Sequence, residues 1–196
     1  LDGSNNLVDY TADSVLGQAD FLSGKYNRGG SVGPSTLSGP TAVTFDSVHN
    51  YLYVSDKFNN RVVVYYVVDI TNGENAIKVL GQANLNSNAQ GHTGNRLTVP
   101  AGVALDTADN ILFVADSSNN RVLAFDVTDI TDNEVAVHVL GQINLTDNAA
   151  NHGANVDAVG MSFPTGLAFN QANKNLYVVD GAGNNRVLVF DTNHLA

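Results

Sequence analysis

Three times in this chain, an aspartate is followed within six residues by two asparagines and an arginine. The three pairs are Asp56 with Arg61, Asp116 with Arg121, and Asp180 with Arg186. A guanidinium forms charge-assisted hydrogen bonds to a carboxylate and also donates to backbone carbonyls. We therefore interpret these side chains first as structural ion pairs and second as candidate binding residues. The third copy has one more residue between its aspartate and its arginine.

A second group of candidates lies in the long polar segments. His92 and His152 each stand ten positions after a glutamine, and Arg28 holds the same place in the first segment. Imidazole is a common zinc ligand, so a rim of loop histidines is a candidate metal site. The sequence has no His-x-His pair, no cysteine, no calcium-loop pattern and no nucleophile motif. We therefore predict no metal site, no cofactor and no catalytic residue, and attribute the matching positions to repetition.

The Asp-to-Arg segments must be positioned by the apolar runs on either side of them. These runs lie at 51–54 and 62–66, at 111–114 and 122–125, and at 176–179 and 187–190. Two runs rich in β-branched and aromatic residues, joined by a short polar segment, predict a β-hairpin. Asparagine tolerates a positive φ and aspartate accepts backbone N–H bonds, so the connecting residues suit a turn.

Two further motifs complete a repeat around each hairpin. A run that begins with proline precedes it, at 40–46, 100–106 and 164–170. A Val-Leu-Gly-Gln run follows the first two hairpins at 79–82 and 139–142, and an additional copy stands at 15–18. The distance from Pro40 to Pro100 is 60 residues and that from Pro100 to Pro164 is 64 residues. Four strands in each repeat are the pattern of a β-propeller blade.

The predicted fold class is thus all-β, with three four-stranded antiparallel repeats that form half of a six-bladed propeller. One unit covers 1–196, with repeats at approximately 15–78, 79–138 and 139–196, and the strand at 14–18 completes a blade. The proline-initiated strands are expected to be innermost. Strand alternation places the hairpin turns and the long loops on one face. That face carries the candidate binding residues Arg28, Asp56, Arg61, His92, Asp116, Arg121, His152, Asp180 and Arg186.

Composition limits the classes of partner. The formal net charge is −10 and only 14% of residues are charged, a balance that argues against nucleic acid as a partner. No apolar run has the length of a membrane span, so we expect no membrane insertion. Loops rich in Asn, Thr, Ser, Gly and Asp are typical of extracellular or cell-surface proteins. The triplet Asn144-Leu145-Thr146 is a possible glycosylation site.

The runs 112–122 and 100–106 resemble the NHL repeat, and the Val-Leu-Gly-Gln runs resemble a long NHL variant of large repetitive bacterial and archaeal surface proteins. The resemblance spans nearly the whole chain and implies a propeller. It implies little about activity, because NHL propellers include RNA-binding, protein-binding, receptor and lyase members. In the family pattern the aspartate that ends one strand and the arginine that opens the next are structural. Lyase members of the family place histidines around a central metal.

Two functional hypotheses remain at this stage. The first is a non-enzymatic extracellular or cell-surface module for binding, adhesion or self-assembly, with a protein or glycan ligand. The second is half of a propeller enzyme, similar to the lyases, whose metal site at His92 or His152 forms only on oligomerisation.

Self-assembly follows from the strand count. Three blades are too few for a closed ring, and the fourth-type strand at 14–18 has the sequence that the last repeat lacks. We expect this strand to complete the last blade of another copy. The result would be a six-bladed homodimer or, where the geometry does not close, a strand-exchanged filament. The competing hypothesis is that the chain is a segment of a longer repeat protein, whose neighbouring blades would supply the missing strands.

Overall fold

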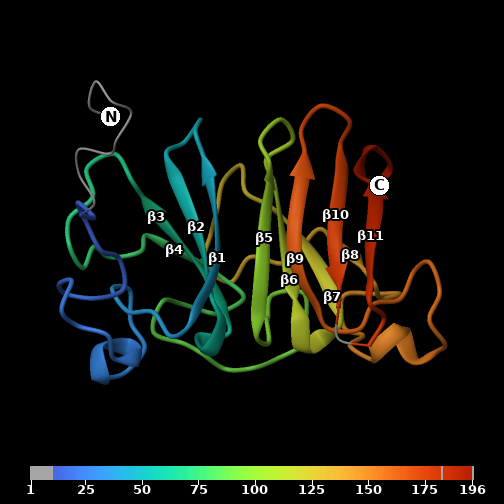
Figure 1. Cartoon of the computed structure of the whole chain (residues 1–196), viewed down its shortest axis with the longest axis horizontal. Coiled ribbons are helices and arrows are strands. Elements are labelled where there is room, and N and C mark those ends of the chain that lie inside the picture. Colours follow the sequence, from blue (N-terminus) through green and yellow to red (C-terminus); the bar gives the residue numbers. More distant parts are fainter. Residues whose placement is uncertain (1–10, 182, 196) are drawn as a thin grey trace, which may run out of the picture.

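The computed structural model describes residues 11–181 and 183–195, so the predicted unit of 1–196 extends beyond them. In this part of the chain, eleven strands form three antiparallel sheets that stand side by side like the blades of a fan (Figure 1). We call the sheets the first, second and third blade, and the contact between two consecutive blades a junction. The predicted all-β class and the propeller-blade architecture are confirmed.

The blades repeat one design. The first contains β1 (Pro40–Asp46), β2 (Tyr51–Asp56), β3 (Arg61–Tyr66) and β4 (Lys78–Leu80). The second contains β5 (Pro100–Asp106), β6 (Ile111–Asp116), β7 (Arg121–Asp126) and β8 (His138–Leu140). The third contains β9 (Pro164–Asn170), β10 (Asn175–Asp180) and β11 (Arg186–Asp191). The remaining elements are short 3₁₀ turns: η1 (Tyr26–Gly29), η2 (Lys57–Asn59), η3 (Ser117–Asn119), η4 (Ala150–Gly153) and η5 (Thr192–His194).

Each blade is a meander in which neighbouring strands in sequence pair with one another. The hairpin register places the aspartate and the arginine of each motif directly opposite each other, as Asp116 is opposite Arg121. β5 contacts both β1 and β9, so these three strands form the inner side of the row, as expected. The hairpin turns and the long loops lie together at the lower edge in Figure 1, as the alternation of strands predicts.

The core of the protein lies between the blades. Val62 and Val64 of β3 pack on Val103 and Leu105 of β5 in one buried cluster at the first junction. At the second junction, Val122 and Ala124 of β7 occupy the corresponding places and pack against the apolar side of the third blade. A blade therefore buries one face on its predecessor and the other on its successor, as stacked repeats do.

The two outer blades each leave part of such a face exposed, although on the first blade Val63 and Tyr65 of β3 are buried in a cluster with Leu16 and Leu37. On the first blade, Val43 is 60% exposed and Phe45 is 50% exposed, whereas their equivalents on β5 are buried. We call this the leading face. On the third blade, Val187 is 59% exposed and Val189 is 54% exposed, whereas their equivalents on β7 are buried. We call this the trailing face.

The strand expected at 14–18 is not present as a strand in the structure. Its backbone nevertheless holds the place of β4 relative to the next blade. Val15 N donates to Asn72 Oδ1 at 3.0 Å, just as Val79 N donates to Asp132 Oδ1 at 3.0 Å. A strand exists only as a paired element, and the described residues provide no partner strand at this position. Within the described residues, the third sheet has three strands, and no fourth strand pairs with β11 at its outer edge.

Candidate functional site

The Asp-to-Arg motif of the second blade is a buried hydrogen-bond centre. Arg121 Nε donates to Asp116 Oδ2 at 2.8 Å, and both side chains are fully buried. Asn119 donates to the same carboxylate oxygen at 2.8 Å, and Thr98 N donates to the other at 2.7 Å. The remaining guanidinium N–H groups donate to the backbone carbonyls of His92, Thr93, Arg96 and Leu145. The arginine thus fastens the long loop before its blade to the long loop after it.

The first blade repeats this arrangement. Arg61 Nε lies 2.7 Å from Asp56 Oδ2, with both side chains fully buried. Its other N–H groups donate to the carbonyls of Gly33 and Thr36 in the preceding loop and of Leu85 in the following loop. The pair thus acts as a structural ion pair that connects two loops.

The third blade keeps the pair in spite of its additional residue. Arg186 Nε donates to Asp180 Oδ2 at 2.8 Å, but the arginine side chain is 24% exposed. It donates to Asp157 and Gly160 in the preceding loop. In the described chain no loop follows the third blade, so the counterpart of the Leu145 contact is missing.

Burial and charge oppose each other at the centre of the second blade. Removal from water raises the pKa of the Asp116 carboxyl, while the Arg121 guanidinium and the donors from Thr98 and Asn119 favour its ionised form. A buried carboxylate is tolerated here because both of its oxygens accept hydrogen bonds and its charge faces a guanidinium.

The second asparagine of the first two motifs is a junction residue that sequence reasoning missed. Asn60 donates from Nδ2 to the carbonyl of Asn88 at 3.0 Å and accepts at Oδ1 from Val99 N at 2.9 Å. Asn120 does the same with Asn148 and Phe163, at 2.9 Å in both bonds. The side chain of Asn60 or Asn120 thereby fixes the start of the next blade.

The glutamine of each Val-Leu-Gly-Gln run completes the junction. Gln82 Nε2 donates to the carbonyl of Asn60 at 2.7 Å and to that of Ala89 at 2.8 Å. Gln142 Nε2 donates to the carbonyl of Asn120 at 2.9 Å and to that of Ala149 at 2.8 Å. The signal was present in the sequence, since these glutamines recur with the asparagines.

Left-handed backbone occurs at the residue before each innermost strand. Val99 has φ +56° and Phe163 has φ +53°, an unfavourable region for β-branched and bulky residues. The asparagine Oδ1 that accepts from their N–H holds this conformation. The equivalent Gly39, with φ +63°, adopts it without a side-chain penalty.

The three loop candidates do not share one environment. Arg28 and His152 lie in equivalent tight turns, η1 and η4, with φ +55° and +44°. His92 lies in a loop of 17 residues (83–99), whereas the other two loops have 21 (19–39 and 143–163), and it has no such turn. The expected equivalence of all three is therefore wrong for His92, because its loop is four residues shorter.

These side chains also have different partners. Arg28 Nη2 donates to the carbonyl of Gly73 at 3.0 Å. His152 Nε2 lies 2.9 Å from Asp157 Oδ2, and the pKa of that carboxyl is lowered to about 2 by the N–H of Gly160, the imidazole and the N–H of Val159. Among the described residues, no group of three His, Asp or Glu side chains is placed to hold a metal ion.

Two other surfaces bear on binding. The innermost strands line an open trough whose two hollows measure about 530 and 330 Å³, with backbone and small side chains of β1, β5 and β9 as its walls. Asn144 is exposed in the loop after β8, and its Oδ1 accepts from Thr146 Oγ1 at 2.7 Å. Its glycosylation, like the binding role of the nine candidate residues, stays a prediction. In the described ranges, no helix is long and apolar enough to cross a membrane.

Comparison with known proteins agrees with this architecture. The family model of the NHL repeat matches residues 97–125 and 161–190. NHL repeat-containing protein 2 of Bos taurus is 29% identical over 92 residues, and that of Homo sapiens is 28% identical over 92 residues. Each match covers 46% of this chain and only 12% of the relative.

Among solved structures, one match is a nidogen–laminin complex, at 17% identity and a TM-score of 0.43 over 74% of this chain and 40% of that one. The two matched segments of the family model coincide with the innermost strand and hairpin of two successive blades. The NHL repeat model thus matches the second and third blades, which agrees with the resemblance to the NHL repeat seen in the sequence.

Proposed function

We propose that this chain is a non-enzymatic, extracellular or cell-surface propeller module that works by binding protein, and whose first partner is a second copy of itself. The observation that carries the proposal is the pair of open faces at the two ends of the row of blades. Val43 and Phe45 on the leading face are exposed, and so are Val187 and Val189 on the trailing face. Exposed apolar patches of this kind mark interaction sites.

The two faces match each other because the chain builds the same interface twice internally. The leading face is equivalent to the side of β5 that packs on β3 at the first junction. The trailing face is equivalent to the side of β7 that packs on the third blade at the second junction. The trailing face of one copy is therefore shaped to pack on the leading face of another. Residues 14–18 of the second copy, already held in the place of a fourth strand, would pair with the free edge of β11.

Two such contacts would close a ring of six blades, which is within the usual size of propellers. The extracellular location rests on the polar, lysine-poor composition, and a further protein or glycan ligand would bind to the face that carries the hairpin turns. The alternative of a metal-dependent lyase needs a site that forms only between two chains, because within the described residues of one chain no group of three His, Asp or Glu side chains is placed to hold a metal ion.

The test is the mass of the protein in solution. Light scattering on the purified chain should give twice the chain mass of 20.6 kDa. Val187→Asp combined with Val189→Asp, or deletion of residues 1–18, should give a folded monomer. Ile143→Asp is the matched control, because Ile143 is also exposed but lies outside both faces. A wild-type monomer at all concentrations would refute the proposal, as would a dimer that the two valine substitutions leave intact.

A further inference from the structure

We propose that Asn185 of one copy docks in a pocket of a second copy, formed by the loop before its first blade, and so makes a third junction between chains. This inference rests on the proposed self-association and adds its polarity and its recognition residue. It predicts that the contact is head-to-tail: the trailing end of one copy binds the leading end of the other.

The pocket has the parts that receive an asparagine elsewhere in the chain. It has a volume of about 220 Å³ and is lined by Gly17, Gln18, Gly24, Leu37 and Gly39 among others. At the first junction, Asn60 bonds to Gln82, to the carbonyl six residues further on and to the N–H of the residue before β5. In the pocket, the carbonyl six residues after Gln18 is that of Gly24, and the residue before β1 is Gly39.

The pocket is also folded as the occupied sites are. The backbone at Gly17 approaches Leu37 as that at Gly81 approaches Leu97. Gly39 has the same left-handed φ as Val99, the residue whose N–H binds Asn60. The site is thus formed before any asparagine enters it.

Polar groups in the pocket lack the partners that their equivalents have. Gln18 Nε2 donates to the carbonyl of Lys25 at 2.9 Å, which matches one of the two bonds of Gln82. Within the described residues, its second bond and a partner for Gly39 N–H are missing. Gln18 Oε1 is also buried without a partner, but so is Gln142 Oε1 at the occupied second junction, so only the two missing donor bonds distinguish the empty pocket. Buried polar groups that lack partners are costly, so an incoming amide would be favoured.

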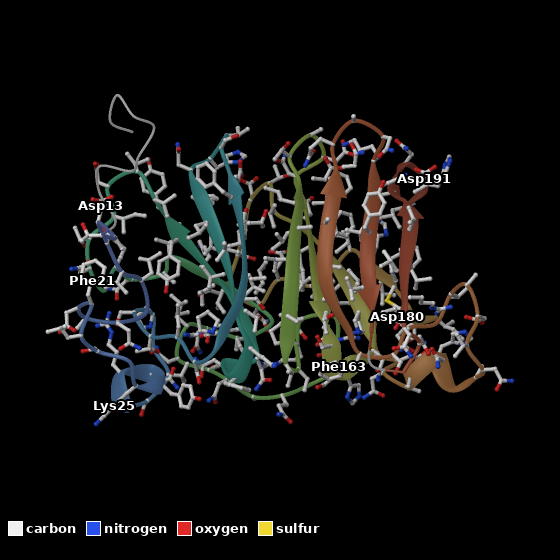
Figure 2. The ribbon with its side chains drawn as sticks, viewed as in Figure 1. Asp13, Phe21, Lys25, Phe163, Asp180 and Asp191 are labelled. Carbon is white, nitrogen blue, oxygen red and sulfur yellow. The ribbon has the colours of Figure 1, made fainter. Side chains whose placement is uncertain are left out.

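Asn185 already has the backbone conformation of the asparagines that dock at the two internal junctions. Asn185 has φ +50°, close to the +53° and +55° of Asn60 and Asn120, so its side chain is presented by the same turn. It is exposed, and its amide makes no hydrogen bond to any residue of the described chain. Lys25, beside the pocket, and Asp180, at the base of the Asn185 turn, lie at opposite ends of the row of blades (Figure 2). One molecule therefore cannot satisfy its own pocket, and a second copy can.

Disulfide trapping tests the contact, because the chain has no cysteine of its own. Asn185→Cys and Gly24→Cys are made in separate chains and mixed under mild oxidation. An added Cβ at Gly24 meets no atom within 4 Å, so this substitution leaves the pocket intact. The internal control is one chain with Asn120→Cys and Asn148→Cys, whose native side chain and carbonyl lie 2.9 Å apart.

The expected result is a covalent two-chain product from the mixture, and none from either variant alone. A chain with both Asn185→Cys and Gly24→Cys should give a doubly linked two-chain ring. Cross-linking of Asn185→Cys with itself would show a tail-to-tail contact and overturn the inference. So would the absence of a product from the mixture when the internal control closes.

Affinity gives an independent readout. Asn185→Gly keeps the left-handed turn but removes the amide, and should raise the dissociation constant of the two-chain species roughly tenfold. Asn110→Gly is the matched control, because Asn110 also has a left-handed φ of +54° but lies in the turn between β5 and β6 of the middle blade, and it should leave the constant unchanged. An unchanged dissociation constant for Asn185→Gly would overturn the docking of Asn185, while the valine substitutions would still test self-association. A wild-type chain that never associates would refute both.

Discussion

The second and third blades have the same motif but differ in what surrounds it. In the second blade, the arginine is fully buried and bonds to two loops, and the asparagine before it, Asn120, holds the start of the next blade. In the third blade, Arg186 is partly exposed and bonds to one loop, and Asn185 is free within the described chain. A blade of this kind is therefore completed by its successor and not by its own residues.

The largest difference between the two blades is expected for the arginines. Arg121→Ala leaves Asp116 buried without its counter-ion and should lower the free energy of unfolding by about 3–5 kcal/mol. Arg186→Ala also leaves a buried carboxylate, that of Asp180, but this arginine is 24% exposed and bonds to one loop only, so the loss should be smaller, about 1–3 kcal/mol. Denaturant unfolding of the monomer measures both.

A double-mutant cycle sharpens this result. Asp116→Ala with Arg121→Ala should cost less than the sum of the two single changes, because the second removal relieves the stranded charge. Equal losses at Arg121 and Arg186, or strict additivity in the cycle, would show that the motif acts alike in both blades and independently of burial.

The asparagines give the next largest difference. Asn120→Gly removes two hydrogen bonds across a junction and should destabilise the monomer by about 1–2 kcal/mol. Asn185→Gly should leave the stability of the monomer unchanged, since this side chain has no partner there. Thermal unfolding at a dilution where the chain is monomeric distinguishes the two, and equal shifts would contradict the assignment of Asn120 as a junction residue.

Acid should loosen the loop before the third blade by protonating one specific carboxyl, that of Asp157. The folded-state pKa of Asp157 is lowered to about 2, below the ordinary value of 3.8. The stability that Asp157 contributes is therefore present above pH ~4 and is lost as the pH falls through about 2. The backbone carbonyl of Asp157 also accepts a hydrogen bond from Arg186, so this loop contacts the third blade.

Amide hydrogen exchange at residues 157–160 across this range measures the effect. Protection should fall between pH ~4 and ~2 in the wild type. In Asp157→Asn it should be low throughout and insensitive to pH. An identical profile for both proteins would contradict the role of the carboxylate.

The smallest effect concerns salt. Two copies with a formal net charge of −10 each repel one another, so added salt should strengthen their association modestly while hardly changing the buried centre of the second blade. Sedimentation at low and high ionic strength measures this, and weakening by salt would indicate that ion pairs hold the dimer.

The sequence predicted the blades because their information is local. The hairpins, the proline-initiated strands and the Asp116–Arg121 pair all follow from alternation, turn residues and repetition. The junctions were missed because Asn120 and Phe163 are 43 residues apart and only the folded blades bring them together. His92 was wrongly matched to Arg28 and His152 because its position was counted only from the preceding glutamine, and that count does not depend on the length of the loop. Residues 14–18 show that a strand-forming sequence needs a partner before it is a strand.

The reach of the arginine across two loops also sets an order in time. Arg61 binds the carbonyl of Leu85, and Arg121 binds that of Leu145, in each case 24 residues further along the chain. During synthesis, the charged centre of a blade cannot be fully desolvated until this later segment has left the ribosome. Each blade therefore matures one step behind the growing chain, and the most recently made blade is always the one with an unfinished ion pair.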